Sequence, residues 1–285
     1  MSGDALLRAC VVGWPIAHSR SPLIHSYWLQ SLGIDGLYER AAVPAGQFAE
    51  FAEGIGREGL IGANVTAPHK EAAFAACHWL TANAADLGAV NTLWRENGKL
   101  CGDNTDVAGF LANLDEQAPG WRERTRNAVV LGAGGAARAI IRGLVLSGID
   151  RVCVVNRSLD RAERLASQLA LGIKLAPWSV LPHLLADADL LVNASSLGMV
   201  GEPPLQIDLE PLGAQAVVAD IVYVPLETPL LAAARARGLC AVDGLGMLLH
   251  QAAPGFERWF GIRPVVTARL RTLIEADILR LDKAQ

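Results

Sequence analysis

The sequence predicts an α/β protein with two domains, and the second domain is expected to contain a doubly wound parallel sheet. Apolar runs in the second half of the chain are short and nearly continuous, as in strands buried on both faces; they lie at 128–131, 151–155, 189–193 and 216–221. Helical patterns at 136–147 and 159–170 alternate with the first of these runs. Alternation of this kind favours a parallel sheet with helices on both faces.

The first hundred residues also alternate strand and helix patterns. Strands are predicted at 9–13, 62–65 and 89–94, and the Asn97-Gly98 pair predicts a hairpin turn before 99–101. Helices are predicted at 22–32, at 68–80 and from Asp106 to about Leu114, and the stretch 115–127 is expected to be a connector. Ser21 would cap the first of these helices and Pro22 would open it.

Two helical patterns, 247–260 and 264–281, follow the second sheet. We expect residues 1–106 to form an N-terminal α/β substrate-binding domain, which the C-terminal helices within 246–285 complete. Residues 107–245 would form a dinucleotide-binding domain. The C-terminal helices would therefore return to the first domain.

The composition excludes several classes of protein. A chain of 285 residues that is 52% hydrophobic and 19% charged can bury a large core and is not disordered. A net charge of −4 without a basic block argues against nucleic-acid binding, and no apolar run is long enough to span a membrane. The five cysteines form no C-x-x-C pair and the six histidines no H-x-x-x-H pair, which predicts reduced thiols, a cytoplasmic location and no metal site. We expect a small-molecule substrate and a monomer or homodimer.

The glycine-rich turn after the run 128–131 is the strongest functional signal. It consists of Gly132, Ala133, Gly134, Gly135 and Ala136, and a helical pattern follows it. Gly132 permits a tight turn, Gly134 lets the backbone approach a pyrophosphate, and the helix N-terminus offers free N–H groups. Such a turn can also be a plain strand–helix connection, so its meaning depends on the next strand.

The residues after that next strand predict which dinucleotide binds. An NAD site usually has an acidic residue there, whereas this chain continues as Asn156-Arg157-Ser158, with Arg161 one helical turn later. Guanidinium groups and a hydroxyl group would bind a 2′-phosphate, so the sequence predicts NADP. The alternative is a solvated helix face on which the arginines pair with Asp160 and Glu163.

Ser19 and Ser21 lie at a predicted helix start, where hydroxyl and free N–H groups can receive a carboxylate; simple helix capping is the alternative.

Lys70 falls in the first turn of the helix predicted from Pro68, where the helix dipole disfavours a cation. That placement suits proton transfer, although a solvated lysine would fit the sequence as well. Asp106 ends a Gly-Asp-Asn-Thr-Asp stretch and could simply cap the next helix.

Seven motifs in one order cover nearly the whole chain, and together they closely resemble the shikimate dehydrogenase family. They are His-Ser-Arg-Ser-Pro, Asn-Val-Thr-x-Pro-x-Lys, Gly-Ala-Val-Asn-Thr, Gly-Asp-Asn-Thr-Asp, Gly-Ala-Gly-Gly-Ala-Ala, Asn-Arg-Ser-x-x-Arg-Ala and Asp-Gly-Leu-Gly-Met-Leu. The resemblance implies a Rossmann-type NADP-binding domain. It also implies the reversible, NADP-dependent reduction of 3-dehydroshikimate to shikimate in aromatic amino-acid biosynthesis.

The resemblance assigns roles to single residues. It implies that Lys70 and Asp106 are the catalytic pair. The substrate carboxylate would be bound by Ser19, Ser21 and Tyr223, and the ring hydroxyls by Asn64, Thr66, Asn91, Asp106 and Gln251. Gly244 and Met247 would contact the cofactor in addition to the glycine turn. Ala67, Val107 and Ser158 depart from the usual family pattern without removing a required polar group.

Two other functions stay open from the sequence. A quinate/shikimate dehydrogenase would oxidise quinate, whose extra hydroxyl beside the carboxylate needs space near Ser19 and Ser21. A non-catalytic NADP-binding sensor would not need Lys70 and Asp106. Taken singly, Asn91, Tyr223 and Gln251 also fit core packing or a solvated position. The paired serines and the NADP-type Asn156-Arg157 favour the biosynthetic enzyme.

Overall fold

The computed structural model describes residues 6–169 and 172–282, which form two compact units. Unit 1 is the described chain up to Thr105 together with Gln251–Ile274, and unit 2 is Asp106–His250 together with the chain from Glu275. Helices α11 (Leu245–Phe260) and α12 (Ala268–Asp282) each contribute residues to both units. The expected boundaries lay after residues 106 and 245, whereas contacts divide the chain after Thr105, His250 and Ile274.

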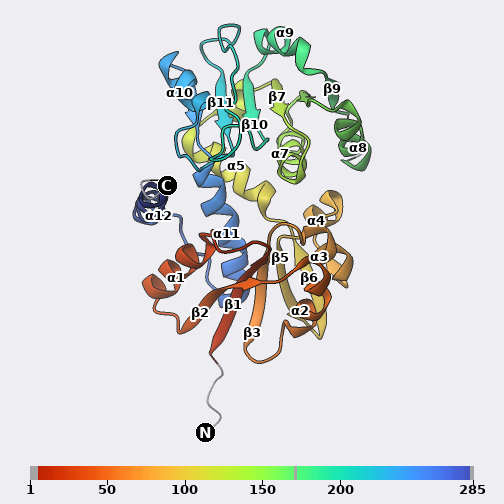
Figure 1. Ribbon diagram of the computed structural model, residues 1–285, viewed down its shortest axis with the longest axis vertical. Helices are drawn as coiled ribbons and strands as arrows, with labels where there is room; N and C mark the ends of the chain where they lie inside the picture. The colour runs from red at the N-terminus through yellow and green to blue at the C-terminus, as the bar shows by residue number, and fades with distance from the viewer. Residues whose placement is uncertain (1–5, 170–171, 283–285) are drawn as a thin grey trace. The chain divides into compact units, whose positions relative to one another are not determined.

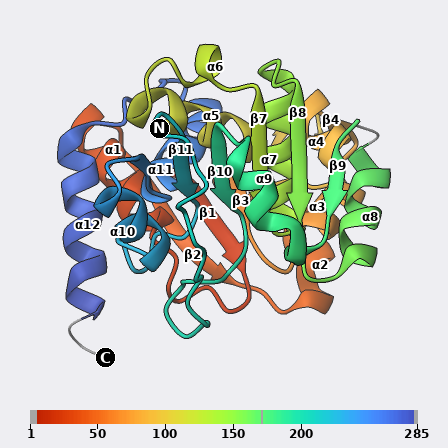
Figure 2. The same cartoon turned by 90° about the horizontal axis from the view of Figure 1, so that it is seen from above.

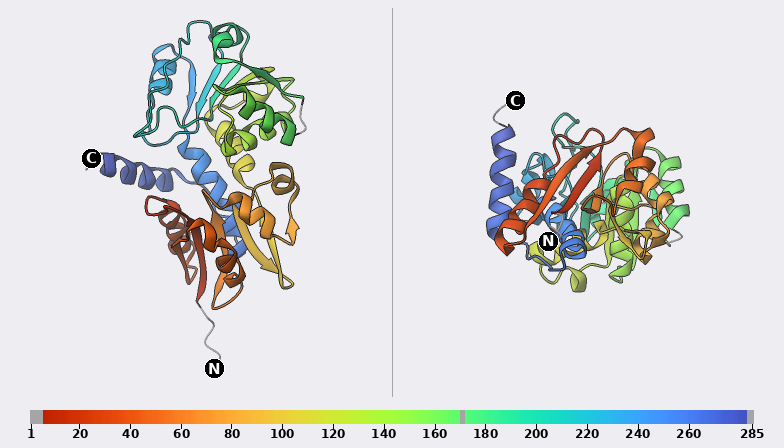
Figure 3. Two further views of the ribbon diagram at one scale, coloured as in Figure 1. Left: turned by 45° about the vertical axis from the view of Figure 1, so that its right-hand side comes forward. Right: turned by 90° about the horizontal axis from the view of Figure 1, so that it is seen from below.

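Unit 1 is built on a six-stranded mixed sheet of order β2-β1-β3-β5-β6-β4. Its strands are β1 (Leu7–Gly13), β2 (Gly36–Ala42), β3 (Leu60–Val65), β4 (Trp79–Leu80), β5 (Thr92–Glu96) and β6 (Lys99–Asp103). Strands β2, β1 and β3 are parallel, and the β5–β6 hairpin, amber in Figure 3, adds β5 antiparallel to β3. The helices are α1 (Ser21–Leu32), α2 (Phe48–Gly54), α3 (Lys70–Ala76) and α4 (Ala82–Leu87), with a 3-10 turn at Ala45–Gln47.

The two faces of this sheet are covered differently. One face packs aliphatic residues such as Val12, Val65 and Leu93 against α2 and its neighbours. The other face carries an aromatic cluster with α11, which runs along the sheet in Figure 1. Gly62 in β3 makes this approach possible, because an added Cβ would lie 2.0 Å from Nε1 of Trp259, which donates a 3.0 Å hydrogen bond to the Leu93 carbonyl.

Two sequence predictions for unit 1 were wrong in detail. The helix predicted at 68–80 is α3, which ends at Ala76, and β4 follows it. The backbone becomes extended at Cys77, and the His78 N–H donates to the Leu100 carbonyl at 2.8 Å, so pairing with β6 overrides the helical pattern. Ser21 is the first residue of α1 rather than its cap; Arg20 occupies the cap position, and Oγ of Ser19 accepts from the Ser21 N–H at 3.3 Å.

Unit 2 confirms the doubly wound parallel sheet, with strand order β12-β11-β10-β7-β8-β9. All neighbouring strands are parallel, and Figure 2 shows β11, β10, β7 and β8 side by side. The strands are β7 (Asn127–Leu131), β8 (Arg151–Val155), β9 (Lys174–Ala176), β10 (Leu190–Asn193), β11 (Val217–Asp220) and β12 (Cys240–Val242). The helices wholly in this unit are α5 (Asp106–Gln117), α6 (Trp121–Arg124), α7 (Gly135–Leu146), α8 (Leu159–Leu169), α9 (Leu181–Ala186) and α10 (Pro229–Ala236), with a 3-10 turn at Trp178–Val180.

The predicted connector at 115–127 was also wrong, because α5 continues to Gln117 and α6 follows. Trp121 is buried, and its Nε1 donates to Oδ1 of Asp115 at 2.7 Å. Burial of one large aromatic side chain therefore folds a segment whose composition indicates a loop. Among the described helices, none combines the length and the apolar character needed to cross a bilayer.

A buried carboxylate at the end of β11 ties unit 2 together. Oδ1 of Asp220 accepts from Nδ2 of Asn193 at 2.8 Å and from the Val222 N–H at 3.0 Å, and Oδ2 accepts from Oγ1 of Thr228 at 2.7 Å. Burial raises the pKa of Asp220 from 3.8 to about 6, although these hydrogen bonds oppose the shift. Ionisation of Asp220 in the folded protein therefore costs free energy that ionisation in the unfolded chain does not.

This cost predicts a pH-dependent free energy of unfolding. Because the folded-state pKa of about 6 lies above 3.8, the contribution of Asp220 is complete below pH 4 and is lost as the pH rises through 6. Asp220→Asn should remove this component, so the stability difference between wild type and variant should change by roughly 2–3 kcal/mol between pH 4 and pH 7. Urea denaturation across this range measures it. Asp187→Asn, at an exposed position of the same unit, is the matched control. Parallel slopes for wild type and Asp220→Asn would contradict the interpretation.

Candidate active site

The topology of unit 1 brings several distant polar segments to one edge of its sheet. β1 and β3 are parallel and end together, with Val12 opposite Val65. β5 begins beside the end of β3, because Thr92 pairs with Asn64, and β6 ends beside the start of β5, because Asp103 pairs with Thr92. The segments after β1, β3 and β6 and before β5 therefore meet at one edge. We call this edge, which carries Ser19, Ser21, Asn64, Thr66, Lys70, Asn91, Thr92 and Thr105, the polar edge.

Ser19 and Ser21 lie where the segment after β1 enters α1. The Ser19 hydroxyl accepts from the Ser21 N–H, and the Ser19 carbonyl accepts from Nε of Arg40 at 3.0 Å. Arg40 lies in β2, so the neighbouring strand fixes this corner. Two hydroxyl groups at a helix start form a site that suits a carboxylate.

Two buried amides form the centre of the polar edge. Nδ2 of Asn64 donates to the Asn91 carbonyl at 3.2 Å and to Oγ1 of Thr92 at 3.3 Å, and Oγ1 of Thr92 donates to Oδ1 of Asn91 at 2.9 Å. Nδ2 of Asn91 donates to Oγ1 of Thr105 at 3.0 Å, which donates in turn to the Gln251 carbonyl at 2.8 Å. We call these five residues the amide–hydroxyl network. The network joins β3, β5, the segment after β6, and α11.

Lys70 is the first residue of α3, which confirms its predicted place in a first helical turn. Its carbonyl accepts from the Val90 N–H at 3.0 Å, so the helix start is tied to the residue that precedes Asn91. Thr66 follows β3 directly, and its N–H donates to the Val12 carbonyl at 2.9 Å. The amine of Lys70 is therefore carried by the same edge as the hydroxyl and amide groups.

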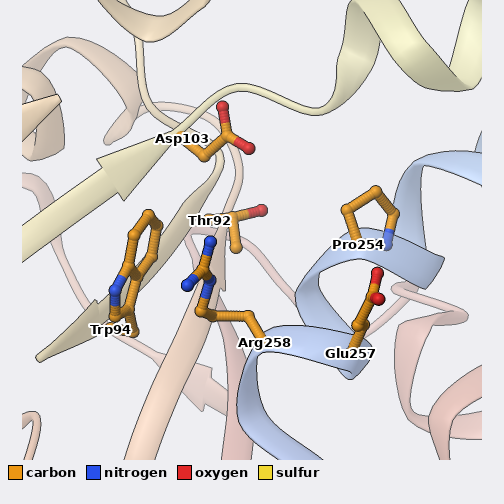
Figure 4. A pocket seen from close by; sticks show the side chains of 6 residues that line it. All are labelled: Thr92, Trp94, Asp103, Pro254, Glu257 and Arg258. Carbon is orange, nitrogen blue, oxygen red and sulfur yellow. The ribbon is translucent and has the colours of Figure 1, made fainter. Parts of the chain in front are cut away.

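A polar pocket of about 380 Å³ adjoins the network through Thr92. In Figure 4 the Arg258 side chain reaches from α11 into this pocket, and its guanidinium lies 4.6 Å from the ring centre of Trp94. The acidic side chains here are engaged by neighbours: Oε2 of Glu257 accepts from Arg263 at 2.9 Å, and Oδ1 of Asp103 accepts from Thr81 and from the Asn104 N–H. Arg258 thus connects α11 to the hairpin, Glu257 connects α11 to the segment that follows it, and Asp103 connects the hairpin to Thr81 at the start of α4.

The glycine turn of unit 2 has the geometry that a dinucleotide site requires. Gly132 has φ +106°, and an added Cβ would lie 3.0 Å from the Ala194 carbonyl oxygen, so only glycine fits there. Apart from its chain neighbours and its own helix backbone, a Cβ built on Gly134 or Gly135 meets no described atom within 4 Å. Ala133 precedes this open stretch, and Ala136 lies in the first turn of α7, a twelve-residue helix. The turn therefore offers an open backbone and a helix N-terminus to a pyrophosphate.

The second cofactor segment lies beside this turn. Leu131 pairs with Val155, and the Gly132 N–H donates to the Val155 carbonyl at 2.9 Å, which places Asn156 next to the turn. Nδ2 of Asn156 donates to the Ser158 carbonyl at 2.8 Å, and Arg157 is exposed. The helical backbone of α8 includes Arg161, but its side chain lies outside the described residues.

Three of the remaining predicted site residues of unit 2, Tyr223, Gly244 and Met247, come after strands of its sheet, whereas Asp106 follows β6 of the unit 1 sheet. Asp106 is the first residue of α5, and Tyr223 lies shortly after β11. Gly244 follows β12, and an added Cβ there would lie 2.3 Å from the Ile221 carbonyl oxygen. Met247 lies in the first turn of α11 and is buried.

Sequence analysis did not identify Thr105 and Thr92 as site residues, although both belong to the amide–hydroxyl network. Thr105 lies within the Gly-Asp-Asn-Thr-Asp stretch, and Thr92 follows Asn91 directly, so both sat inside motifs that the sequence had already singled out. Asp220 was not identified either; a single acidic residue at the end of an apolar strand was its only signal.

A doubly wound sheet with such a glycine turn, in a chain whose other unit collects hydroxyls, amides and a lysine at one sheet edge, defines a nicotinamide-dependent oxidoreductase. Three family models match the chain: the shikimate dehydrogenase substrate binding domain at residues 11–93, shikimate / quinate 5-dehydrogenase at 116–200, and the shikimate 5′-dehydrogenase C-terminal domain at 244–268. The chain is 56% identical over 279 residues to the shikimate dehydrogenase (NADP(+)) of Rhodopseudomonas palustris (strain HaA2), covering 97% of this chain and 98% of the relative. This chain belongs to the shikimate dehydrogenase family.

Solved structures agree with this assignment. The shikimate 5-dehydrogenase of Thermus thermophilus, in complex with NADP(H) and shikimate, has a TM-score of 0.81 and 38% identity, covering 91% of this chain and 95% of that one. The quinate dehydrogenase of Corynebacterium glutamicum, in complex with NAD, has a TM-score of 0.87 and 30% identity, covering 96% of this chain and 100% of that one. The fold alone therefore does not separate the two activities.

Substitution of Gly132 and of Gly134 by alanine should impair the protein in different ways. Gly132→Ala should lower the free energy of unfolding by about 1–3 kcal/mol, because its φ is strained for alanine and the Ala194 carbonyl is close. Gly134→Ala should keep wild-type stability but raise the Kd for NADP roughly tenfold or more, because the methyl group fills the space of the pyrophosphate. Thermal denaturation and titration calorimetry measure the two effects.

Gly213→Ala is the matched control, since no described atom lies within 4 Å of its added Cβ and it lies outside the turn. It should change neither quantity. A Gly134→Ala variant that binds NADP as tightly as wild type would place the pyrophosphate elsewhere.

Proposed function

We propose that this chain catalyses the reversible, NADP-dependent reduction of 3-dehydroshikimate to shikimate. The observation that carries the proposal is the polar edge of unit 1. There a lysine at a helix start, two serines at another helix start and a buried pair of amides lie on adjoining segments of one sheet. A small ring compound with one carboxylate and several hydroxyl groups needs this combination of partners. The named activity of the 56% identical relative supports the same reaction.

NADPH, when bound, supplies the hydride that reduces the ketone. Lys70 then provides the proton for the carbonyl oxygen, and its ammonium stabilises the negative charge that develops there. We assign Asp106 the partner role of keeping this ammonium charged and oriented. No part of this scheme needs a metal ion, because Lys70 supplies both the charge and the proton.

The remaining residues of the proposal bind and orient. Ser19, Ser21 and Tyr223 are assigned to the substrate carboxylate, and Asn64, Thr66, Asn91 and Gln251 to the ring hydroxyls together with Asp106. For the cofactor we assign the pyrophosphate to the turn 132–136 and the 2′-phosphate to Asn156, Arg157, Ser158 and Arg161. Gly244 and Met247 are assigned to the remaining cofactor contacts.

Quinate oxidation is the second candidate function, because a quinate dehydrogenase shares the fold at a TM-score of 0.87. That structure is in complex with NAD, whereas the segment after β8 in this chain places an exposed Arg157 where an NAD site usually has an acidic residue. This difference favours NADP and the shikimate reaction. A cytoplasmic location belongs to the same proposal, and the five free cysteines support it.

Arg157→Ala tests the cofactor assignment. The substitution removes a charged partner of the 2′-phosphate, and a charge-assisted hydrogen bond contributes about 1.5–3 kcal/mol, so the KM for NADP should rise by roughly 10–100-fold. The kinetics with NAD should stay within about twofold, because NAD has no 2′-phosphate. Arg151→Ala removes a guanidinium from the other end of β8 and should leave both cofactors unaffected. An equal loss with NADP and NAD for Arg157→Ala would reject the assignment.

Lys70→Ala tests the chemistry. The variant should fold, bind NADP and shikimate within about tenfold of wild type, and lose 10²–10⁴ in kcat, roughly the contribution of a general acid–base group. Asp106→Asn should also lower kcat, and the double variant should be less impaired than the product of the two single effects. Lys99→Ala, at an exposed position of the same unit, is the control. Near wild-type kcat in Lys70→Ala would show that the chain binds the ligands without using Lys70, as a sensor would.

A further inference from the structure

We propose that Tyr38 is a positioning residue of the polar edge: its hydroxyl group fixes the direction of the Asn64 side-chain amide and thereby decides how Asn64 meets the substrate. The inference rests on the proposed function, because it takes Asn64 to contact a ring hydroxyl. Tyr38 lies in β2 and is only 3% exposed, so we assign it an effect on the substrate through Asn64 and no contact of its own. Nothing in the sequence motifs marked it.

The contact between the two side chains crosses a strand. β1 lies between β2 and β3, and Ala9 of β1 pairs with both Tyr38 and Gly62, so these residues share one face of the sheet. Asn64, two residues after Gly62, shares that face as well. From there the Tyr38 hydroxyl donates to Oδ1 of Asn64 at 2.6 Å in a fully buried hydrogen bond.

The partners of Asn64 leave one orientation for its amide. Both N–H bonds of Nδ2 are directed at acceptors, the Asn91 carbonyl and Oγ1 of Thr92. A flipped amide would turn Oδ1 toward the Asn91 carbonyl, placing acceptor against acceptor. Tyr38 stabilises the observed orientation because it supplies a donor to Oδ1. Because both Nδ2 hydrogens are engaged, Asn64 can offer a ring hydroxyl only its Oδ1 as an acceptor and cannot donate to an oxygen that gains negative charge.

The ring of Tyr38 is itself held in place. It stacks on the imidazole of His25 at 3.9 Å between ring centres, with 2° between the ring planes, and Trp259 lies 6.0 Å away. Burial lowers the pKa of His25 to about 3, so the stack is neutral at physiological pH. Burial also raises the pKa of Tyr38 well above 10, so its hydroxyl group keeps the proton that it donates to Asn64.

Tyr38→Phe removes only the hydroxyl group and keeps the stacked ring. With Asn64 less firmly oriented, the KM for shikimate should rise about fivefold, while kcat and the Kd for NADP stay within about twofold. In an Asn64→Ala background the same substitution should change KM by less than about twofold, because its effect passes through Asn64. Tyr27→Phe is the matched control: its hydroxyl lies 3.2 Å from Oγ1 of Thr267 at an exposed site, and its KM should equal that of wild type.

The assays are run at saturating NADP, which stabilises the folded chain. If Tyr38→Phe still does not fold, hydrogen exchange of the Asn64 side-chain amide in shikimate-free wild type replaces it, with exposed Asn97 as reference. The orientation argument requires slow exchange at Asn64, and exchange as fast as at Asn97 would overturn it. An unchanged KM in Tyr38→Phe, or the same KM factor in both backgrounds, would also overturn it. Failure of the wild-type chain to oxidise shikimate with NADP would instead reject the proposed function, and this inference with it.

Discussion

The hydrogen bonding of two buried amides, Asn64 and Asn91, is the constraint on which unit 1 depends. A buried amide is costly unless its donors and acceptors are paired. Here Asn64 donates to the Asn91 carbonyl and to Thr92, and Asn91 is paired with Thr92 and with Thr105, whose hydroxyl donates in turn to a carbonyl of α11. Since these partners come from four different parts of the chain, the network forms only when β3, β5, the segment after β6 and α11 are all in place. The polar edge is therefore organised by the folding of unit 1.

Unit 2 depends on a constraint of a different kind, which is the lack of a side chain at one position. Gly132 adopts a backbone conformation that alanine disfavours, and it lies against the Ala194 carbonyl after β10. The turn can therefore close tightly between β7 and its neighbours β8 and β10 at the point where the strand order reverses. In doubly wound sheets ligands bind at this point. The two units thus prepare their ligand contacts by opposite means, with dense side-chain hydrogen bonding in one and an open backbone in the other.

Sequence patterns predicted the elements whose signal is local. The strand predicted at 151–155 and the helices predicted at 159–170 and 247–260 correspond to β8, α8 and α11, because each has its own periodicity and a clear beginning. Strands β2, β9 and β12 were not predicted, since β2 carries charged residues and the other two have three residues each. The helix prediction was wrong at 77–80 because the extended conformation of this segment depends on pairing with β6, which has no local signal in the sequence.

The residues of the candidate site also divide into those with a local sequence signal and those that depend on contacts between distant segments. Gly132, Lys70 and Asn156 could be selected from the sequence because they lie in motifs with a strand or helix on each side. Tyr38 could not, because its role comes from a hydrogen bond to a residue two strands away. Thr105 became meaningful only when its hydroxyl was seen between Asn91 and the Gln251 carbonyl. Contacts between distant strands are not encoded in local spacing, so the supporting residues of a site are found later than its motifs.

The central claim is that this chain is built for one substrate and one cofactor. It is tested most directly by the steady-state kcat/KM of the purified wild-type chain, with shikimate and with quinate, each in the presence of NADP and of NAD. We predict that shikimate with NADP exceeds shikimate with NAD by roughly two to four orders of magnitude, as expected from two charge-assisted hydrogen bonds to the 2′-phosphate, and that quinate is the poorer substrate with either cofactor. Equal kcat/KM values for NADP and NAD, or a higher value for quinate than for shikimate, would contradict the account.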